Sequence, residues 1–236
     1  MGMKTGVLCI HGFSGGPYEV EPFAEFLREQ TEWNVRIAKL SGHGLPEELN
    51  MKGNRSYDWI RDVEVAYRSL ARDVDEVIVV GFSMGGLLAI HLANKYPVSK
   101  LVLLSAALSY ISLKQITEDI VEMVGDLKQG TLQENELYER YMFKLKHVPF
   151  LSTVEFMKVA QLAKKEIELV TCPTYIVQGR RDGIVPVKTA QLLFKKLQMA
   201  EKCMYISEKG KHFICYSDDC DIWFNQVFQF LKEPKF

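Results

Sequence analysis

The chain has 236 residues, of which 47% are hydrophobic and 25% are charged. These values are ordinary for a soluble globular protein with a sizeable core, and the length suits one large α/β domain or two small ones. Because 29 basic and 30 acidic residues leave a formal net charge of −1, we expect neither a nucleic acid nor an anionic membrane surface as a partner.

Five cysteines, an odd number with no C-x-x-C spacing, argue against a disulfide framework and against a zinc site. The first apolar run, at residues 7–10, is too short for the core of a secretory signal. No apolar run approaches the ~20 residues of a membrane span. We therefore expect a cytoplasmic protein with no stable insertion into a membrane, and the sequence indicates no oligomeric state.

Short apolar runs rich in β-branched residues alternate along the chain with amphipathic stretches. Continuous hydrophobicity is typical of strands that are covered on both faces, and the alternation favours a parallel sheet flanked by helices. The strands are expected at residues 5–10, 34–39, 76–80, 100–104, 174–178 and 202–206. The helices are expected at residues 17–29, 56–71, 85–95, 187–198 and 220–232.

One stretch breaks this alternation, because it contains no convincing strand between the expected strands at 100–104 and 174–178. A helical insertion at this point predicts a cap over a site, and the alternative is extra helical packing with no contact to a site. The predicted domains are a core of residues 1–106 and 169–236 and a cap of residues 107–168. Within the cap, helices are expected at about 112–128, 133–145 and 152–167.

The strongest chemical motif is Gly-Phe-Ser-Met-Gly-Gly at residues 81–86, which follows one expected strand and opens the next helix. This is the setting of a G-x-S-x-G nucleophile elbow. The glycines allow the close approach of neighbouring backbone that so tight a turn requires. Ser83 would then project from the sheet edge at a helix N-terminus, where N–H groups favour negative charge. We therefore predict Ser83 as a nucleophile.

A glycine-rich loop, His-Gly-Phe-Ser-Gly-Gly-Pro at residues 11–17, follows the first expected strand. With such an elbow, an oxyanion hole takes one backbone N–H from the residue after the nucleophile and one from a loop of this kind. The two donors would be Met84 and Phe13. A phosphate cradle is the alternative, but no lysine follows in P-loop spacing and no G-x-G-x-x-G is present. We expect His11 to bond the loop backbone rather than to take part in the chemistry.

Asp182 lies just past the expected strand at 174–178. A carboxylate there sits at the C-terminal sheet edge, where ligands gather in open parallel sheets. Its role would be to orient a histidine and to stabilise the imidazolium. The alternatives are a turn, or an ion pair with Arg180 or Arg181.

The general base is expected to be His212, shortly after the last expected strand. Among the five histidines, His91 lies in the helix after the elbow and His147 lies in the expected cap. Only His212 completes the order Ser…Asp…His that accompanies this elbow.

A fourth histidine, His43, stands between two glycines after the second expected strand. The glycines indicate a tight loop near the pocket. We favour a role in stabilising that loop over a contact with substrate, and keep His43 as a possible pocket residue.

Together these motifs resemble those of the small bacterial carboxylesterases and monoacylglycerol lipases of the α/β-hydrolase superfamily. The resemblance runs from about residue 5 to 232 and is weakest in the expected cap. It implies the α/β-hydrolase fold, with a mostly parallel sheet flanked by helices and a cap inserted after the strand at 100–104. It also implies hydrolysis of short- to medium-chain esters without a cofactor, and sometimes of monoacylglycerols. Ser83, Asp182 and His212 match the family's triad.

The resulting hypothesis is a carboxylesterase that acts on a small-molecule ester through an acyl-enzyme on Ser83. The alternatives among enzymes are a monoacylglycerol lipase and a thioesterase. A non-catalytic ligand binder on the same fold is the alternative from another class. The apolar side chains of the expected cap are divided between packing onto the core and lining an acyl pocket, in proportions that the sequence does not separate.

Overall fold

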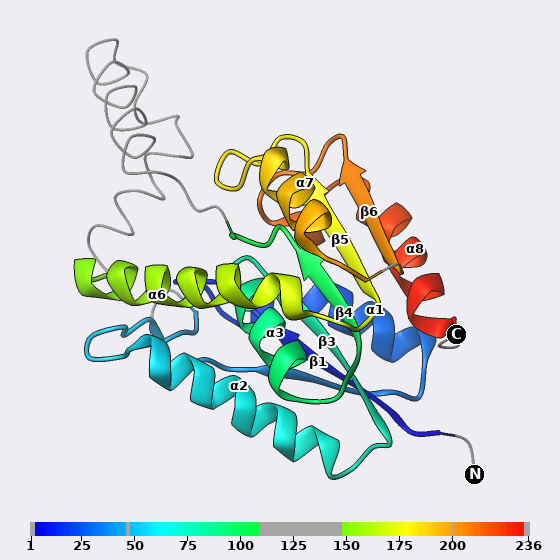
Figure 1. Cartoon of the computed structure of the whole chain (residues 1–236), viewed down its shortest axis with the longest axis horizontal. Helices are drawn as coiled ribbons and strands as arrows, with labels where there is room; N and C mark the ends of the chain where they lie inside the picture. Colours follow the sequence, from blue (N-terminus) through cyan, green and yellow to red (C-terminus); the bar gives the residue numbers. More distant parts are fainter. Residues whose placement is uncertain (1–2, 46–47, 109–147, 200, 234–236) are drawn as a thin grey trace.

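The computed structural model of the chain describes residues 3–45, 48–108, 148–199 and 201–233 (Figure 1). Six parallel strands form one sheet in the order β2-β1-β3-β4-β5-β6. The strands are β1 Thr5–Ile10, β2 Asn34–Ala38, β3 Glu76–Phe82, β4 Val98–Leu104, β5 Thr174–Gly179 and β6 Lys202–Ser207. The expected parallel sheet is confirmed, and each expected strand is present.

Strand β3, which precedes Ser83, is longer than the sequence predicts. Gly81 and Phe82 still pair with Leu103 and Leu104 of β4. The hydrogen-bonded ladder therefore holds the backbone up to the residue before Ser83, which is why a glycine that normally weakens a strand does not end this one.

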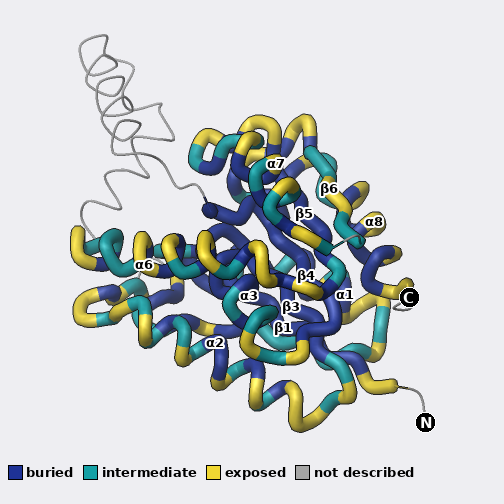
Figure 2. The backbone as a smooth tube through the Cα atoms, in the orientation of Figure 1, coloured by how far each residue is buried: buried dark blue, intermediate teal, exposed yellow. Residues whose placement is uncertain are grey.

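Helices cover both faces of the sheet, as Figures 1 and 2 show. One apolar cluster joins one sheet face to α2, α3, α6 and α7, and the other joins the opposite face to α1 and α8. The helices are α1 Glu21–Gln30, α2 Ser56–Ala71, α3 Met84–Lys95, α6 Phe150–Glu166, α7 Val187–Lys196 and α8 Cys220–Lys232. Among the described residues, short 3₁₀ helices lie at η1 Pro17–Glu19, η4 Ile167–Leu169 and η5 Ile214–Tyr216.

Strand β1 illustrates why the strands are apolar throughout. Leu8 and Ile10 belong to the cluster under α2 and α3, whereas Val7 and Cys9 belong to the cluster under α1 and α8. All four side chains are fully buried. Because successive strand residues point to opposite faces, a sheet covered on both sides requires an apolar residue at each position.

The helix expected at 17–29 is two elements, η1 and α1, with Val20 between them. Pro22 stands in the first turn of α1, where its missing N–H costs no hydrogen bond. A proline disfavours helical backbone at the residue before it, so it favours a new start over a continuous helix. This break places Glu19 at the end of η1.

Two of the three helices expected in the cap, 112–128 and 133–145, lie outside the described residues. The third corresponds to α6. Its buried side chains Phe156, Val159 and Ala163 join the same apolar cluster as α3. Helix α6 therefore packs on the sheet face that also carries α2, α3 and α7.

Candidate active site

Ser83 lies at the turn between β3 and α3 and has φ 52° and ψ −115°. Such a backbone conformation is rare for a residue with a side chain and costs on the order of 1–3 kcal/mol. The neighbouring glycines make the turn feasible. A Cβ on Gly81 would collide with the carbonyl of Gly85, and a Cβ on Gly85 would collide with the carbonyl of Ile10. The elbow expected from the sequence therefore has the geometry that its glycines imply.

His212 connects this serine to a carboxylate. Its Nε2 lies 3.2 Å from the Ser83 Oγ, and its Nδ1 lies 2.8 Å from the Asp182 Oδ2. All three residues are buried, with exposed fractions of 7–8%. With Asp182 as an acceptor, Nδ1 carries the proton of the neutral imidazole, and the Nε2 lone pair faces the serine hydroxyl. The structure thus brings together the three side chains that the sequence singles out.

The segment after β5, residues 180–186, holds the carboxylate of Asp182 and is called here the β5 loop. The Asp182 Oδ1 accepts the N–H groups of Ile184 and Val185, each at 2.8 Å. In addition, the Arg181 N–H donates to the Gly210 carbonyl at 2.9 Å. The last bond ties the β5 loop to the segment that carries His212, so Asp182 and His212 are positioned by one small network.

Sequence reasoning missed Gln178, the residue before the end of β5. Its side chain is buried and its Nε2 donates to both the Asp182 Oδ2 and the Val185 carbonyl, each at 2.9 Å. Asp182 therefore receives hydrogen bonds from Gln178, from two backbone N–H groups and from His212. The available signal was a polar residue inside an otherwise apolar strand, because a buried polar side chain needs a partner.

The segment after β1, residues 11–16, is called here the β1 loop and carries Phe13. A Cβ on Gly85 would also meet the His11 carbonyl, so the β1 loop lies directly against the first turn of α3. Met84 is the first residue of α3, and the first N–H groups of a helix have no acceptor within the helix. Both segments expected to supply oxyanion donors thus border the elbow.

Aromatic packing supports the Phe13 side chain from the side of α6 and α2. Its ring is stacked on that of Phe156 with centroids 5.2 Å apart, and it meets the edge of Trp59 at 5.8 Å. Phe156 belongs to the apolar residues of the expected cap. It is 1% exposed and packs against the core as well as against this loop.

His11 bonds the loop backbone, as the sequence predicts. Its Nε2 accepts the Leu40 N–H at 3.2 Å, so Nδ1 carries the proton and donates to the Gly12 carbonyl at 3.0 Å. Burial, with a further contribution from His43, lowers the pKa of His11 from 6.5 to about 3. The ring is therefore neutral over the range in which most enzymes work, and both of its hydrogen bonds persist.

His43 is 2% exposed and lies between the rings of His11, Phe13 and Trp59. Its Nδ1 is 3.0 Å from the Ser41 carbonyl, and its Nε2 has no partner among the described residues. Burial lowers the pKa of His43 to about 4. These contacts are those of a residue that packs the loops behind Phe13.

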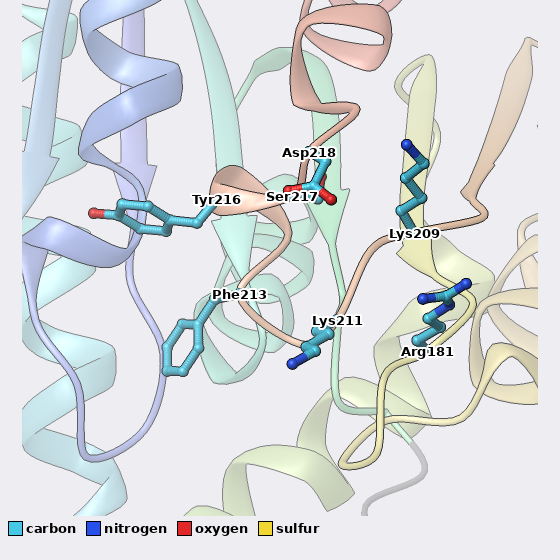
Figure 3. A pocket seen from close by; sticks show the side chains of 7 residues that line it. All are labelled: Arg181, Lys209, Lys211, Phe213, Tyr216, Ser217 and Asp218. Carbon is cyan, nitrogen blue, oxygen red and sulfur yellow. The ribbon is translucent and has the colours of Figure 1, made fainter. Parts of the chain in front are cut away.

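A cavity of about 400 Å³ lies beside the loops that hold the acid and the base (Figure 3). Arg181 precedes Asp182 in the chain, and Lys211 and Phe213 flank His212. Neither Asp182 nor His212 lines this cavity, and neither does Ser83. The lining residues are Arg181, Lys209, Lys211, Phe213, Tyr216, Ser217 and Asp218.

Two further properties concern only the part of the chain that the structure describes. There, no group of three or more His, Cys, Asp or Glu side chains could hold a metal ion. Within the same ranges, no helix combines the length and the apolar character needed to cross a membrane.

Known proteins similar to this chain include esterases and lipases. A thermostable monoacylglycerol lipase from Bacillus sp. strain H-257 is 27% identical over 206 residues, which cover 84% of this chain and 78% of the lipase. A carboxylesterase from Bacillus subtilis strain 168 is 22% identical over 234 residues, which cover 98% and 94% of the two chains.

Solved structures show the same fold. A structure from work on LipS and LipT, two metagenome-derived lipolytic enzymes, has a TM-score of 0.77 at 22% identity. The match covers 98% of this chain and 94% of the matched chain. The monoacylglycerol lipase of Paleococcus ferrophilus has a TM-score of 0.70 at 17% identity, with coverage of 96% and 93%. The resemblance to small bacterial esterases is thereby confirmed.

Residues 3–219 match the family model described as serine aminopeptidase, S33. With its parallel six-stranded sheet flanked by helices, the chain is a hydrolase of the α/β-hydrolase fold and belongs to the S33 family.

Proposed function

We propose that the protein is a serine-dependent carboxylesterase, with Ser83 as nucleophile, His212 as general base and Asp182 as the residue that orients His212. The observation that carries the proposal is the unbroken hydrogen-bonded chain from the Ser83 Oγ through His212 to Asp182. It is buried and lies at the C-terminal edge of a parallel sheet, where this fold carries its chemistry.

The proposed reaction has two steps. His212 Nε2 takes the proton from Ser83 as its Oγ attacks the ester carbonyl, and the N–H groups of Met84 and Phe13 bind the oxyanion that forms. Collapse of this intermediate breaks the ester C–O bond, and the alcohol leaves with the proton from His212. Water then attacks the acyl-enzyme by the same route and releases the carboxylic acid and free Ser83.

The substrate class is drawn from the relatives and from the apolar side chains near the site. The ring of Phe13 is half-buried and stacks on the buried ring of Phe156, so Phe13 offers aromatic surface at the β1 loop, which suits an acyl chain. Residues 107–168 are proposed as a cap that completes the acyl pocket over this surface. We therefore favour short- to medium-chain acyl esters of small alcohols, hydrolysed without a cofactor.

Monoacylglycerol is the second candidate substrate, because the relative at 27% identity is a monoacylglycerol lipase. A thioester would enter the same chemistry. Matched acyl chains on glycerol, ethanol and a thiol separate the three: the favoured proposal predicts that kcat/KM depends on chain length and little on whether the alcohol is glycerol.

We also propose that the enzyme works in the cytoplasm. The support is that all five cysteines are free thiols in the structure, with Cys9 and Cys215 fully or almost fully buried. Unpaired thiols are the usual state in a reducing compartment.

The deciding experiment combines labelling by a fluorophosphonate probe with hydrolysis of p-nitrophenyl butyrate. We expect Ser83→Ala to lose both. Ser105→Ala is the matched control, because Ser105 is also buried, also has a positive φ, and has an Oγ without a partner among the described residues. A folded wild-type protein that neither labels nor hydrolyses would favour a non-catalytic ligand binder instead.

A further inference from the structure

Glu19 is a buried carboxyl group outside the proposed triad. It ends η1 and is 4% exposed. Carboxylates are almost never buried without a partner, because their desolvation is costly. The side chain of Glu19 turns back to the β1 loop, where its Oε2 accepts the N–H of Gly12 at 2.8 Å.

The β1 loop has a space that this carboxyl group fills. A Cβ on Gly15 would collide with the Glu19 carboxyl group, and one on Gly12 would lie 3.1 Å from the Glu19 Oε2. Both glycines thus leave room for the carboxyl group inside the turn, so the close contact depends on more than one residue of the loop.

The contact to Gly12 bears directly on the neighbouring peptide unit. The Gly12 N–H is bound by Glu19, while the Gly12 carbonyl accepts the Nδ1–H of His11. That carbonyl and the Phe13 N–H belong to the same planar peptide unit. Both the N–H and the carbonyl of Gly12 are therefore hydrogen-bonded, and together these bonds orient the peptide unit that contains the Phe13 N–H.

We infer that Glu19 is a positioning residue for the oxyanion hole, which fixes Gly12 so that the Phe13 N–H points at the developing oxyanion. This inference rests on the proposed function. A donor contributes to catalysis only if it already points to where charge develops, because reorientation during the reaction would cancel the gain. Glycine has the greatest backbone freedom of any residue, so Gly12 needs such a restraint.

The contact itself is tested without reference to activity. In the amide NMR spectrum, the Gly12 N–H should resonate downfield in the wild type because its acceptor is a carboxyl oxygen. Glu19→Ala should move this resonance upfield and speed its exchange with solvent. Glu21→Ala is the matched control, because Glu21 is a partly exposed glutamate whose carboxylate pairs with Arg28.

The positioning role is tested by kinetics on the ester that the wild type hydrolyses best. Loss of one oxyanion donor costs about 10²–10³ in kcat, so misdirecting a donor should cost about 10-fold or more. We expect Glu19→Ala to lower kcat by that amount and to leave KM within about twofold, since the donor acts on the transition state. Glu19→Gln keeps an acceptor oxygen and should recover most of kcat.

Several outcomes overturn the inference. One is a shifted Gly12 resonance with an unchanged kcat in Glu19→Ala, and another is a rise in KM alone. If Glu19→Ala does not fold, Gly15→Ala takes its place, since its Cβ displaces the same carboxyl group; an unchanged kcat in that variant is equally decisive. A wild type without esterase activity would contradict the proposed function and this role together. An active wild type whose Glu19 variants keep the same kcat would contradict this role alone.

Discussion

The β5 loop and the β1 loop flank the same serine, but they are held in place in different ways. Asp182 finds three of its four donors within four residues of itself, in Gln178, Ile184 and Val185. The β1 loop is held by Glu19, seven residues beyond Gly12, and also by distant partners: the Leu40 N–H donates to His11, and the Gly44 N–H donates to the Gly15 carbonyl at 3.1 Å. Asp182 is thus oriented mainly by residues close to it in the chain, whereas the expected oxyanion donor also depends on tertiary contacts.

This difference has a physical consequence for mutation. A self-contained loop keeps its shape when distant residues change, so damage on the acid side should be confined to catalysis. A loop that is held by contacts with distant residues should transmit changes in the packing or protonation of those residues to the site. The three predictions below test this contrast.

The largest expected effect is that of Asp182→Asn. The amide can present an N–H to His212, which turns the imidazole to the tautomer with a protonated Nε2 and removes the acceptor that Ser83 needs. We expect kcat to fall about 10⁴-fold, equivalent to about 5.5 kcal/mol of barrier. The measurement is kcat for ester hydrolysis by purified Asp182→Asn, together with a thermal unfolding curve that shows that the variant is folded.

The difference between the two loops also predicts the thermal stability of Asp182→Asn. The Gln178 Nε2 loses its acceptor, but Oδ1 can still accept the N–H groups of Ile184 and Val185, so cooperative unfolding should be retained with a midpoint only moderately below that of the wild type. A variant that loses its fold together with its activity would show that the β5 loop is not self-contained.

The sequence predicts the acid side of the site more completely than the oxyanion side, for the same reason. Ser83, Asp182 and His212 each follow a strand in a motif whose spacing is local, and the parallel sheet carries those strand ends to one edge. Glu19 stands in a stretch that reads as one helix from 17 to 29, so nothing local distinguishes its buried side chain from an exposed one. The structure shows why Glu19 is buried: the helix is interrupted at Val20, and the Glu19 side chain at the end of η1 contacts Gly12.

The layers of the fold were also open to prediction, since continuous apolar runs identify strands covered on both faces. What periodicity could not reveal was the role of a helix once formed. Helix α6 is recognisable from its sequence, but its packing on α3 and the stacking of Phe156 on Phe13 join segments that lie far apart in the chain. Its part in a cap stays a prediction, because residues 109–147 lie outside the described ranges.

The second prediction concerns pH and the loops behind Phe13. Burial lowers the pKa of His43 from 6.5 to about 4. Between these pH values the unfolded chain binds more protons than the folded one, so the folded state becomes less stable as the pH decreases. From pH 7 to pH 5 the wild type should lose about 2 kcal/mol through His43. Urea unfolding at both pH values should show that His43→Gln lacks this part of the loss.

His91 supplies the opposite sign as a control. The Glu166 carboxylate, bound to its Nδ1 at 2.9 Å, raises the pKa of His91. Its contribution is therefore complete below the unfolded pKa and is lost as pH rises through the folded one. His91→Gln should destabilise the protein more at pH 5 than at pH 8. If both variants changed the pH dependence in the same direction, the assignment of either histidine would be wrong.

The smallest expected effect belongs to Gln178→Leu. The variant removes the donor to the Asp182 Oδ2 and leaves the Val185 carbonyl without this partner, while two backbone N–H groups and His212 still hold the carboxylate. We expect kcat to fall about 10-fold, or about 1.4 kcal/mol, with little change in KM. Gln198→Leu is the matched control, because Gln198 is exposed and its side chain donates to the nearby Lys196 carbonyl. A loss as large as that of Asp182→Asn would mean that the backbone donors do not orient the acid by themselves, and the contrast between the two loops would then disappear.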